Sequence, residues 1–524
     1  MSRISKVFLS FLAPGLIGLI FLASHLFQLT KLPVFADEAI YIRWSQLIID
    51  DAQRYAFFSL NDGKTPLFIW LQVPFQNLLS DPLWAGRLVA VLAGFGTIFV
   101  ILALVKELGL SRNWQYVAAG AMTVWPFWFF HHRMALMDGL LVFWLALSWL
   151  CLLRALKTTN YVWALAAGLS FGLSLMTKLP AILFLPSLGL VIIQGYLLNQ
   201  PQPSLGNFMN KFKNWLPLMM LGVTSSLGIF LLLKLHPAFS QLFSRGGDFL
   251  FKLPELTAVQ IWHNFWANGT NFSVIFGHYL TWGALSLLII GLFTPKRRQM
   301  IGLLLFMSLS FMLPIQIMGK VIYARYLLPA ALPLTLAIIL AIESLVARIN
   351  LEKKLVVRTG LATILAVLLA QSLTQSSRFM IYSWLNPNAL DLTLSDQVQY
   401  LTEWSSGNGL KEVANAALTV NKSQSLLILT EGFFGTLPDG LLMYFHQQKL
   451  GNIFVEGIGQ PVREIPEKMI EKSKNYDQTW LVVNSHRMKI SLPPDQLLGQ
   501  YCRLPGYPCL QIWNLKPYIK VLSP

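Results

Sequence analysis

The chain has 524 residues, of which 55% are hydrophobic and only 12% are charged, with a mean hydropathy of +0.55 and a formal net charge of +16. These values exclude an ordinary soluble protein of this length and indicate a polytopic membrane protein. No basic block is interleaved with stacking aromatic residues in a soluble segment, so we exclude nucleic acid as the main partner. Much of the positive charge lies in short segments between apolar runs, where it directs topology and meets anionic lipid headgroups.

Apolar runs of membrane-spanning length recur along the chain and predict about eleven transmembrane helices. The first run follows two basic residues, but it is about 20 residues long and lacks a clear small-x-small cleavage motif. We therefore interpret it as a retained helix and signal anchor. The predicted spans lie near residues 8–30, 84–105, 114–131, 139–155, 161–177, 180–198, 215–235, 280–293, 301–318, 327–347 and 358–376.

The distribution of basic residues predicts the orientation of these spans. If the N-terminus, with Arg3 and Lys6, is cytoplasmic, every predicted cytoplasmic loop carries at least two positive charges. The opposite loops are sparser in positive charge for their length. An odd number of spans in the plasma membrane then leaves the C-terminal segment outside the cytoplasm. The basic residues of the cytoplasmic loops are Lys106, Arg112, Arg154, Lys157, Lys211, Lys213, Lys296, Arg297, Arg298, Arg348, Lys353, Lys354 and Arg358.

Two predicted outer loops are long, and the first, residues 31–83, carries the most unusual charges. Asp37 and Glu38 follow the first span directly, and Lys64 stands near the end of the loop. Placing two adjacent carboxylates close to the membrane hydrocarbon is energetically unfavourable, so their position suggests a functional role. A carboxylate can accept the proton of an acceptor hydroxyl, and a lysine can hold an anionic leaving group. This combination favours glycosyl transfer from a phosphate-linked donor; the alternative is a pair of ordinary loop charges.

The second long outer loop, residues 236–279, is aromatic and weakly charged, and it suits amphipathic helices lying flat on the membrane beside an active site. From about residue 379 the composition becomes that of a soluble domain. The segments SLLILTEGF, NIFVEGIG and TWLVVNSH predict buried strands separated by helical segments. We therefore expect a transmembrane domain over residues 1–378 and a small extracytoplasmic α/β domain over residues 379–524.

The cysteines are compatible with a C-terminal segment either outside the cytoplasm or within it. Cys502 and Cys509 flank the turn-rich segment LPGYP, so they are placed to close a hairpin disulfide if this segment lies outside the cytoplasm. The alternative is two free thiols. Cys151 lies in an apolar run, where packing explains it.

Further charged residues stand at the outer ends of later spans. Asp138, about to enter a span in RMALMDGLLVFW, needs a partner such as Arg133, a metal ion or helix-terminus amides. Lys178, in SLMTKLPAI, either extends to the lipid headgroups or belongs to a site. Arg325, beside Tyr326 in YARYLLP, is placed to meet a lipid phosphate, or else anchors the span at the interface.

A metal site has little support in these residues. His131 and His132 are neighbours in sequence, and neighbouring side chains usually point in different directions, so we predict no metal ligands there.

Several stretches, in order, resemble the GT-C superfamily of integral membrane glycosyltransferases. The similarity is to the branch of bacterial dolichyl-phosphate-mannose-protein mannosyltransferase-like and aminoarabinose-transferase-like enzymes, and it covers most of residues 1–420. The order and spacing of the stretches make the resemblance fairly specific. They are FADEAIY, GKTPL, RMALMDGLLVFW, GLSFGLSLMTKLPAILFLP, Ala324–Pro333 and QYLTEWSSGNGLKEVANAAL.

The resemblance implies a polytopic α-helical GT-C fold and a polyprenyl-phosphate sugar as donor, with chemistry on the extracytoplasmic face. It implies that Asp37 is the catalytic base, with Glu38 beside it. It further implies that Lys64 and Arg325 bind the donor phosphate and that Asp138 supports the site. We group Arg133, Lys178 and Tyr326 with these supporting residues.

The same resemblance leaves other properties open. No cofactor is required by this chemistry; a divalent cation stays open, although the second long outer loop offers only His263 and His278 as ligands. The acceptor is a protein, a lipid or a glycan, and neither it nor the sugar can be read from the residues.

Two other function classes compete with a transferase. A transporter or flippase of a lipid-linked glycan would also be polytopic and basic, but transporters tend to carry mid-membrane charges and internal repeats, which we do not find. A membrane scaffold that presents the C-terminal domain leaves the pair Asp37 and Glu38 without a role.

Overall fold

The computed structural model describes residues 3–199, 204–446, 448 and 452–522, and the side chains of Arg3 and Lys6 lie outside this description. The chain forms two compact units. Unit 1 comprises Met1–Phe27, Ala56–Phe68 and Leu88–Ile381, and unit 2 comprises Gln28–Tyr55, Ile69–Arg87 and Tyr382–Pro524. The last break lies close to the predicted boundary at residue 379, but unit 2 also includes two segments from the predicted first outer loop and its surroundings.

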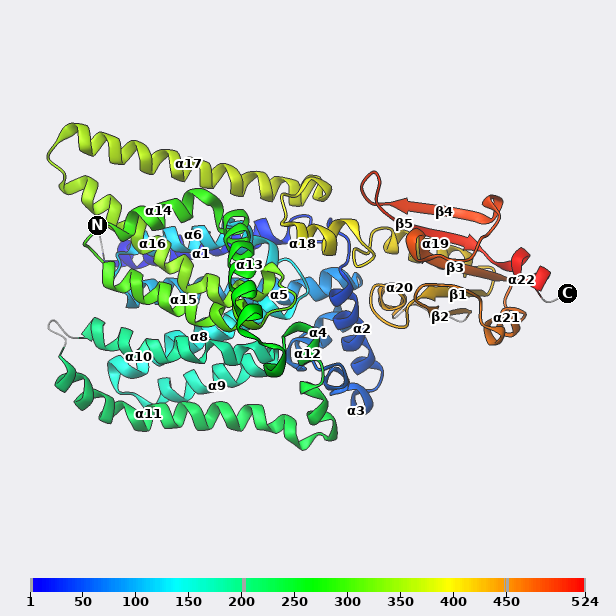
Figure 1. Cartoon of the computed structure of the whole chain (residues 1–524), viewed down its shortest axis with the longest axis horizontal. Coiled ribbons are helices and arrows are strands. Elements are labelled where there is room, and N and C mark those ends of the chain that lie inside the picture. Colours follow the sequence, from blue (N-terminus) through cyan, green and yellow to red (C-terminus); the bar gives the residue numbers. More distant parts are fainter. Residues whose placement is uncertain (1–2, 200–203, 447, 449–451, 523–524) are drawn as a thin grey trace. The chain divides into compact units, whose positions relative to one another are not determined.

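Unit 1 is a bundle of apolar helices. Most of them run in one direction in Figure 1, whereas α13 crosses that direction. Its helices are α1 (Arg3–Leu26), α5 (Pro82–Glu107), α6 (Arg112–Val124), α7 (Pro126–His131), α8 (Met137–Thr158), α9 (Tyr161–Thr177), α10 (Leu185–Asn199), α11 (Leu205–Leu231), α12 (Gly246–Phe249), α13 (Ala258–Phe276), α14 (Trp282–Leu292), α15 (Arg298–Met318), α16 (Leu328–Leu351) and α17 (Leu355–Leu385), of which α5 and α17 extend into unit 2.

Among the described residues, 8 helical segments are long and apolar enough to cross a membrane. Two shorter apolar helices, Ala13–Leu26 and Tyr161–Thr177, coincide with two further predicted spans. The remaining predicted span, near 114–131, is divided into α6 and α7 because Trp125 is extended and Pro126 begins a new helix. All eleven predicted segments are therefore helical, although only eight helical segments in the described part of the chain meet the criteria of length and composition for a membrane span.

The sequence predicted that the outer loop 236–279 stops where a span begins at residue 280, but the structure has one continuous helical segment there. Instead of stopping before a span at residue 280, α13 continues through a π-helical turn, Gly277–Thr281, into α14. The buried face of α13 is apolar at its C-terminal end and includes two asparagines before it. Asn264 donates to the Ile317 carbonyl at 2.7 Å, and Asn268 donates to the Gln316 carbonyl at 2.9 Å. These bonds fix α13 against the end of α15.

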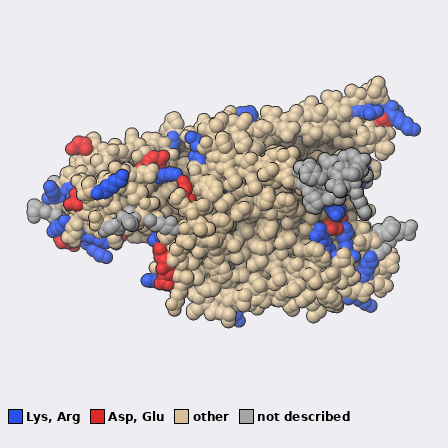
Figure 2. Space-filling view, turned by 180° about the vertical axis from the view of Figure 1, so that it is seen from behind, with Lys and Arg blue, Asp and Glu red and all other residues tan. Residues whose placement is uncertain are grey.

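At one end of the bundle, loops predicted to be cytoplasmic contact one another. Glu107 accepts hydrogen bonds from Arg154 at 3.0 Å and from Lys157 at 2.9 Å. Arg297 donates to the carbonyls of Leu108 and Gly109, each at 3.1 Å. These contacts agree with the prediction that the three loops share one side of the membrane. The face of unit 1 in Figure 2 has a broad band without charged side chains, and basic side chains gather at its end on the right.

Unit 2 contains a five-stranded sheet of order β2-β1-β3-β5-β4. The strands β2, β1 and β3 are parallel, and β5 and β4 continue the sheet in antiparallel pairing. The three predicted strands are present, and β1 and β3 are buried as expected, whereas β2 is mostly half-buried because it lies at the sheet edge. A disulfide between Cys502 and Cys509 joins the ends of β4 and β5. The strands are β1 (Leu426–Glu431), β2 (Ile453–Gly459), β3 (Gln478–Asn484), β4 (Leu497–Cys502) and β5 (Cys509–Asn514).

Helices cover this sheet and complete unit 2. Residues of β1 and β3 form a core with Met469 and Ile519, and burial of this apolar surface drives the folding of the domain. The segments GNGLKEVANAAL and PVREIPEKMIEKS, expected to be polar or helical, contain α19, which precedes β1, and α21, which lies between β2 and β3. The helices of unit 2 are α2 (Ala36–Asp50), α3 (Ala52–Tyr55), most of α4 (Leu67–Leu78), α18 (Leu394–Gln397), α19 (Leu410–Val420), α20 (Asp439–Phe445), α21 (Glu467–Ser473) and α22 (Lys516–Leu522).

Candidate functional site

In unit 1, Asp138 and Lys178 form an ion pair. Asp138 is in the first turn of α8, where the positive end of the helix dipole favours a carboxylate. Lys178 caps the C-terminus of α9, and its Nζ lies 2.7 Å from Asp138 Oδ1. The Asp138 side chain is 5% exposed and the Lys178 side chain 21% exposed. Lys178, rather than Arg133, therefore supplies the partner that the sequence required for Asp138.

Two tyrosines and Arg325 extend this pair into a larger group. The Lys178 ammonium lies 4.7 Å from the centre of the Tyr326 ring. The Arg325 guanidinium lies 5.3 Å from the same ring and 4.8 Å from the ring of Tyr323, and Arg325 is 5% exposed. Aromatic faces attract cations at these distances and fix their position. We call Asp138, Lys178, Tyr323, Arg325 and Tyr326 the Lys178 cluster.

Lys64 belongs to a second group of charges in unit 1. Its Nζ lies 3.0 Å from Asp62, and Asp62 also contacts Arg245 at 2.8 Å. Arg245 in turn contacts Asp248 at 3.1 Å. We call Asp62, Lys64, Arg245 and Asp248 the Lys64 cluster. Sequence reasoning found Lys64 but missed its partners, although Asp62 stands only two positions away from it.

Phe249 connects the two clusters. Its ring centre lies 5.9 Å from the Arg245 guanidinium and 6.3 Å from the centre of the Tyr326 ring. The four predicted site residues Lys64, Asp138, Lys178 and Arg325 therefore lie along one chain of contacts, although they come from segments far apart in sequence. The two clusters together hold four cationic side chains and three carboxylates.

Arg133 has a different environment. Its guanidinium donates to the carbonyls of Ser24 at 3.0 Å, His25 at 2.6 Å and Phe27 at 2.9 Å, at the C-terminal end of α1. Helix carbonyls at this end lack partners within the helix, so a buried arginine satisfies them. The observed contacts give Arg133 a structural role at α1 and do not include Asp138.

The structure does not assemble a metal site from the described residues. In those ranges, no group of three or more His, Cys, Asp and Glu side chains is arranged to hold a metal ion. His131 and His132 are both buried; His131 Nδ1 pairs with the Phe127 carbonyl at 2.8 Å, and His132 stacks on Trp128.

In unit 2, Glu38 forms a buried pair with Arg87. Arg87 Nε and Nη2 donate to the two Glu38 carboxylate oxygens at 2.8 and 2.7 Å, and neither side chain is more than 1% exposed. Glu38 Oε2 also accepts from the Phe35 amide at 2.9 Å, which begins α2 in the manner of a capping box. Sequence reasoning missed Arg87; the signal was a single arginine within a predicted span, which requires a partner.

Arg87 also fixes the segment before α2. Its Nη1 donates to the carbonyls of Leu29 at 2.8 Å and Leu32 at 2.9 Å, and its Nη2 donates to that of Pro33 at 3.1 Å. A guanidinium with several acceptors in a buried site holds the backbone around it rigidly. This arginine therefore contributes to the position of Asp37, one residue before Glu38.

Asp37 is half-buried at the start of α2, and its surroundings include the C-terminal domain. The Ala36 amide donates to the Ser405 carbonyl at 3.0 Å, and the Gly407 amide donates to the Val34 carbonyl at 2.7 Å. The Phe35 ring packs against that of Tyr400 with 4.8 Å between their centres. Residues 403–407, which we call the Trp404 loop, thus lie directly beside the start of α2.

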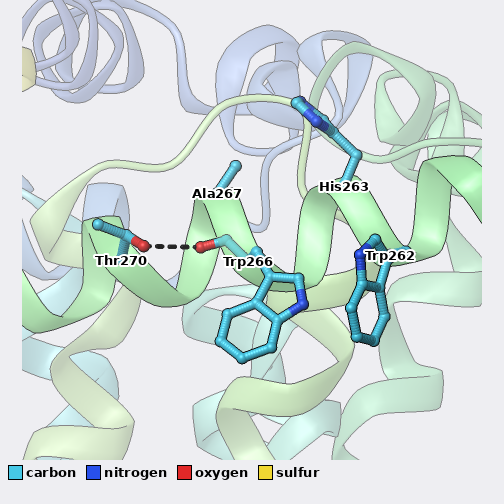
Figure 3. Close-up of a pocket in the computed structure, with 5 residues that line it drawn as sticks. All are labelled: Trp262, His263, Trp266, Ala267 and Thr270. Atoms are coloured by element: carbon cyan, nitrogen blue, oxygen red, sulfur yellow. Dashed lines mark hydrogen bonds between the residues drawn. The ribbon is translucent and has the colours of Figure 1, made fainter.

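A shallow cavity of about 420 Å³ lies on the outward face of α13. Figure 3 shows the side chains of Trp262 and Trp266 on the same side of the helix and that of His263 on the opposite side. The two indole rings pack with 5.6 Å between their centres, and the Thr270 hydroxyl donates to the Trp266 carbonyl at 2.9 Å. Paired exposed tryptophans are typical of a membrane–water interface, and the lining has no carboxylate.

Comparison with known proteins agrees with this architecture. Residues 63–230 match the family described as Dolichyl-phosphate-mannose-protein mannosyltransferase. The crystal structure of ArnT from Cupriavidus metallidurans bound to undecaprenyl phosphate aligns over 98% of both chains, with a TM-score of 0.55 and 15% identity. The apo structure of the same protein gives a TM-score of 0.53 over the same share. At 15% identity, this likeness shows that the chain has the fold of ArnT.

A curated relative adds a short sequence match. The chain is 33% identical over 120 residues to YycA of Bacillus subtilis strain 168, a proposed mannosyltransferase. The match covers 22% of this chain and 17% of YycA, so it concerns a short part of that relative. The likeness to ArnT confirms the predicted fold, a membrane helix bundle with a small C-terminal sheet domain.

Proposed function

We propose that this chain is a membrane glycosyltransferase that moves a sugar from a polyprenyl-phosphate donor to an acceptor hydroxyl on the extracytoplasmic face, with inversion at the anomeric carbon. The observation that carries the proposal is the Lys178 cluster, in which two cations are held by aromatic rings and one carboxylate in a protein of GT-C fold.

On the donor side, Arg325 and Lys64 bind the phosphate that leaves. A polyprenyl phosphate departs as an anion, so positioned cations lower the energy of the charge that develops on it. Lys178 adds a third cation, and Asp138 and Tyr326 hold it in position. Two comparisons support this donor: the matching family is described by dolichyl-phosphate-mannose, and the ArnT structure was obtained with undecaprenyl phosphate.

On the acceptor side, Asp37 acts as the general base. It takes the proton of the acceptor hydroxyl while the oxygen forms a bond to the anomeric carbon, and the bond from that carbon to the phosphate oxygen breaks with its electron pair on the phosphate. Attack opposite the leaving group inverts the configuration. Glu38 positions Asp37, because both of its oxygens are engaged by Arg87 and the helix start.

This chemistry needs no resident cofactor. The cationic side chains supply the charge stabilisation that a divalent cation provides in many enzymes acting on nucleotide sugars. We therefore propose that activity is independent of added metal and survives treatment with a chelator.

The test measures release of undecaprenyl phosphate from purified full-length protein. The donors are undecaprenyl-phosphate-linked mannose, glucose and 4-amino-4-deoxyarabinose, and a solubilised membrane extract of the source cells supplies the acceptor. We expect release from at least one donor and a loss of at least ~100-fold in Asp37→Asn, which removes the base. The matched control is Asp51→Asn, at the other end of α2, which should retain activity.

Two results would overturn the proposal. Full activity of folded Asp37→Asn would exclude the base assignment. Absence of release from every donor, in protein that still binds undecaprenyl phosphate, would instead favour transport of a lipid-linked glycan.

A further inference from the structure

The carboxyl ends of the parallel strands in unit 2 carry a polar group that the proposed transfer does not use. The strand β1 ends at Glu431, β2 at Gly459 and β3 at Asn484, and all three strands run in the same direction. In open α/β sheets, ligands bind outside the carboxyl ends of parallel strands. This edge is therefore the first place to search for a ligand site in the C-terminal domain.

Buried hydrogen-bonding side chains converge on this edge. Glu431, 2% exposed, accepts from Asn484 Nδ2 at 2.6 Å and from the Asn484 amide at 3.1 Å. Arg487 Nη1 lies 3.5 Å from Glu431, and both of its terminal nitrogens donate to the Gln460 side-chain oxygen at 3.0 Å when that amide is oriented to satisfy its neighbours. Arg503, 7% exposed, donates to the Ser406 carbonyl at 2.6 Å. We call Glu431, Asn484, Arg487 and Arg503 the strand-end cluster.

Two buried polar atoms of the strand-end cluster make no hydrogen bond in the described structure. Within the ranges that the structure describes, Asn484 Oδ1 and Arg503 Nε have no hydrogen-bonding partner, although Asn484 is only 1% exposed. Buried polar atoms normally have partners, so such atoms point to a ligand or to water. Two carboxylates, Glu431 and Glu403, lie within electrostatic range of both Arg487 and Arg503 and offset their charges. A neutral ligand with hydroxyl groups suits this balance better than a phosphate.

Aromatic rings stand beside the same cluster. The Arg487 guanidinium lies 4.1 Å from the centre of the Trp404 ring. Residues 432–436 pass this ring, since a Cβ built on Gly435 would lie 3.9 Å from it. In this segment Phe433 is 71% exposed and Phe434 is 64% exposed, which is unusual for large apolar side chains in a soluble domain. Apolar faces next to a few fixed polar groups are the combination that binds small ligands.

The Trp404 loop joins this edge to the candidate base. Its Trp404 contacts Arg487, its Ser406 carbonyl accepts from Arg503, and its Ser405 carbonyl accepts from the Ala36 amide, next to Asp37. All of these residues belong to unit 2. The strand-end cluster and the start of α2 are therefore connected through one short backbone segment.

We propose that the carboxyl edge of this sheet binds a neutral sugar residue of the acceptor, so that the acceptor is a glycan or carries one. Phe433, Phe434 and Trp404 present ring faces to the sugar, and the strand-end cluster exchanges hydrogen bonds with its hydroxyls. The proposal rests on the proposed transferase function and gives the acceptor its chemical class.

The test uses full-length protein in lipid nanodiscs on an array of defined oligosaccharides, followed by titration of the strongest binder. We expect selective binding that weakens at least ten-fold in the double variant Phe433→Ala, Phe434→Ala. The conservative variant Phe434→Tyr keeps the ring and should bind like the parent. The matched control is Phe454→Ala, which removes a ring near the start of β2, at the opposite edge.

Binding and catalysis are read separately in this design. Asp37→Asn should bind the oligosaccharides of the array as the parent does while losing sugar transfer. A wrong transferase proposal and a wrong sugar-site proposal therefore give different results. Absence of binding by folded protein, or binding equally strong in the double variant, overturns the sugar site. A nitroxide at Phe434→Cys that is accessible to oxygen but not to aqueous nickel would also overturn it, because the two phenylalanines then insert into lipid.

Discussion

Two neighbouring carboxylates at the start of α2 have different surroundings. Glu38 is fully buried and accepts hydrogen bonds from Arg87 and from the Phe35 amide, whereas Asp37 is half-buried. A general base must reach the acceptor hydroxyl, and a buried carboxylate whose two oxygens already accept hydrogen bonds is not accessible to it. These surroundings favour Asp37 for proton transfer and Glu38 for holding the helix start.

Breaking the pair between Glu38 and Arg87 should destabilise the protein. We expect Glu38→Gln and Arg87→Gln each to lower the free energy of unfolding by roughly 3 kcal/mol, because each leaves a buried charge without its partner. The double variant should lose less than the sum of the two, since no unpaired charge remains. Thermal unfolding in detergent measures all three variants. Strictly additive losses would contradict a coupled pair.

Asp439, in the first turn of α20, should make stability depend on pH. Burial raises the pKa of its carboxyl from 3.8 to about 6, although the Gly435 amide donates to it at 2.6 Å. Because the folded pKa lies above the unfolded one, the folded state holds more protons between about pH 4 and 6, and stability falls as pH rises through that window.

Asp439→Asn should therefore stabilise the protein at pH 7.5, raising the melting temperature by ~2–4 °C. The gain should diminish towards pH 4, where the parent carboxyl is already protonated. Melting curves of parent and variant at several pH values provide the measurement, and a gain that does not change with pH would argue against a titrating Asp439.

Site residues were predictable from the sequence where their charge contrasts with the residues around them. Asp138, Lys178 and Arg325 stood out because each is an ionisable residue at the end of an apolar run, and Lys64 stood out in the first outer loop. Arg87 was hidden because one charge barely lowers the average hydropathy of a long span. Pairings such as Asp138 with Lys178 depend on which helix ends meet, and sequence separation does not specify this.

At the scale of elements, apolar runs predicted most of the sheet. The strand β1 is buried at every position, as expected for a parallel strand covered on both faces, and it was recognised as a continuous apolar run. The strand β4 alternates between half-buried and exposed residues, and its pairing with β5 is interrupted by a register shift near Gly499. Edge strands of this kind have a weak sequence signal, so β4 and β5 were expected only as a turn between cysteines.

The helix α13 packs two asparagines against α15 and exposes two tryptophans, whereas a helix on the surface of a soluble protein usually exposes its polar residues. Its buried face carries Asn264 and Asn268, which bond to backbone carbonyls, while Trp262 is 66% exposed and Trp266 is 56% exposed. An apolar outer face is favourable only in contact with lipid. Hydropathy alone placed the start of a span at residue 280 and therefore missed the helical continuity with α14.

We expect the outer face of α13 to lie in the lipid interface. A nitroxide attached at Thr270→Cys, on the exposed face beside Trp266, should collide with oxygen more often than with an aqueous nickel complex. A nitroxide at Lys489→Cys in the C-terminal domain should show the opposite preference. The measurement is power-saturation electron paramagnetic resonance in nanodiscs. Equal access of nickel to both labels would show that α13 faces water.

At the scale of the whole molecule, charge distribution predicted which loops share a side but not how they pack. The alternation of basic loops grouped residues near 106, 154 and 297, and contacts between Glu107, Arg154 and Lys157 and from Arg297 to Leu108 support this grouping. The assignment of an end to the cytoplasm rests on the positive-inside rule.

That assignment leads to a direct test with single cysteines. The chain's own cysteines do not interfere, because Cys151 is buried and Cys502 is bonded to Cys509. The helix α17 is long and apolar enough to cross the membrane once between Lys353 and the C-terminal domain, so we expect these two parts to face opposite compartments. A disulfide in the C-terminal domain agrees with an oxidising location outside the cytoplasm.

In intact spheroplasts, a membrane-impermeant maleimide should label Lys489→Cys at once and Lys353→Cys only after lysis. Both positions are exposed, so a difference in labelling reports the compartment rather than burial. The reverse order would place the C-terminal domain in the cytoplasm, where polyprenyl-phosphate chemistry on the outer face could not use the strand-end cluster. Labelling of both before lysis would instead show that α17 does not span the membrane.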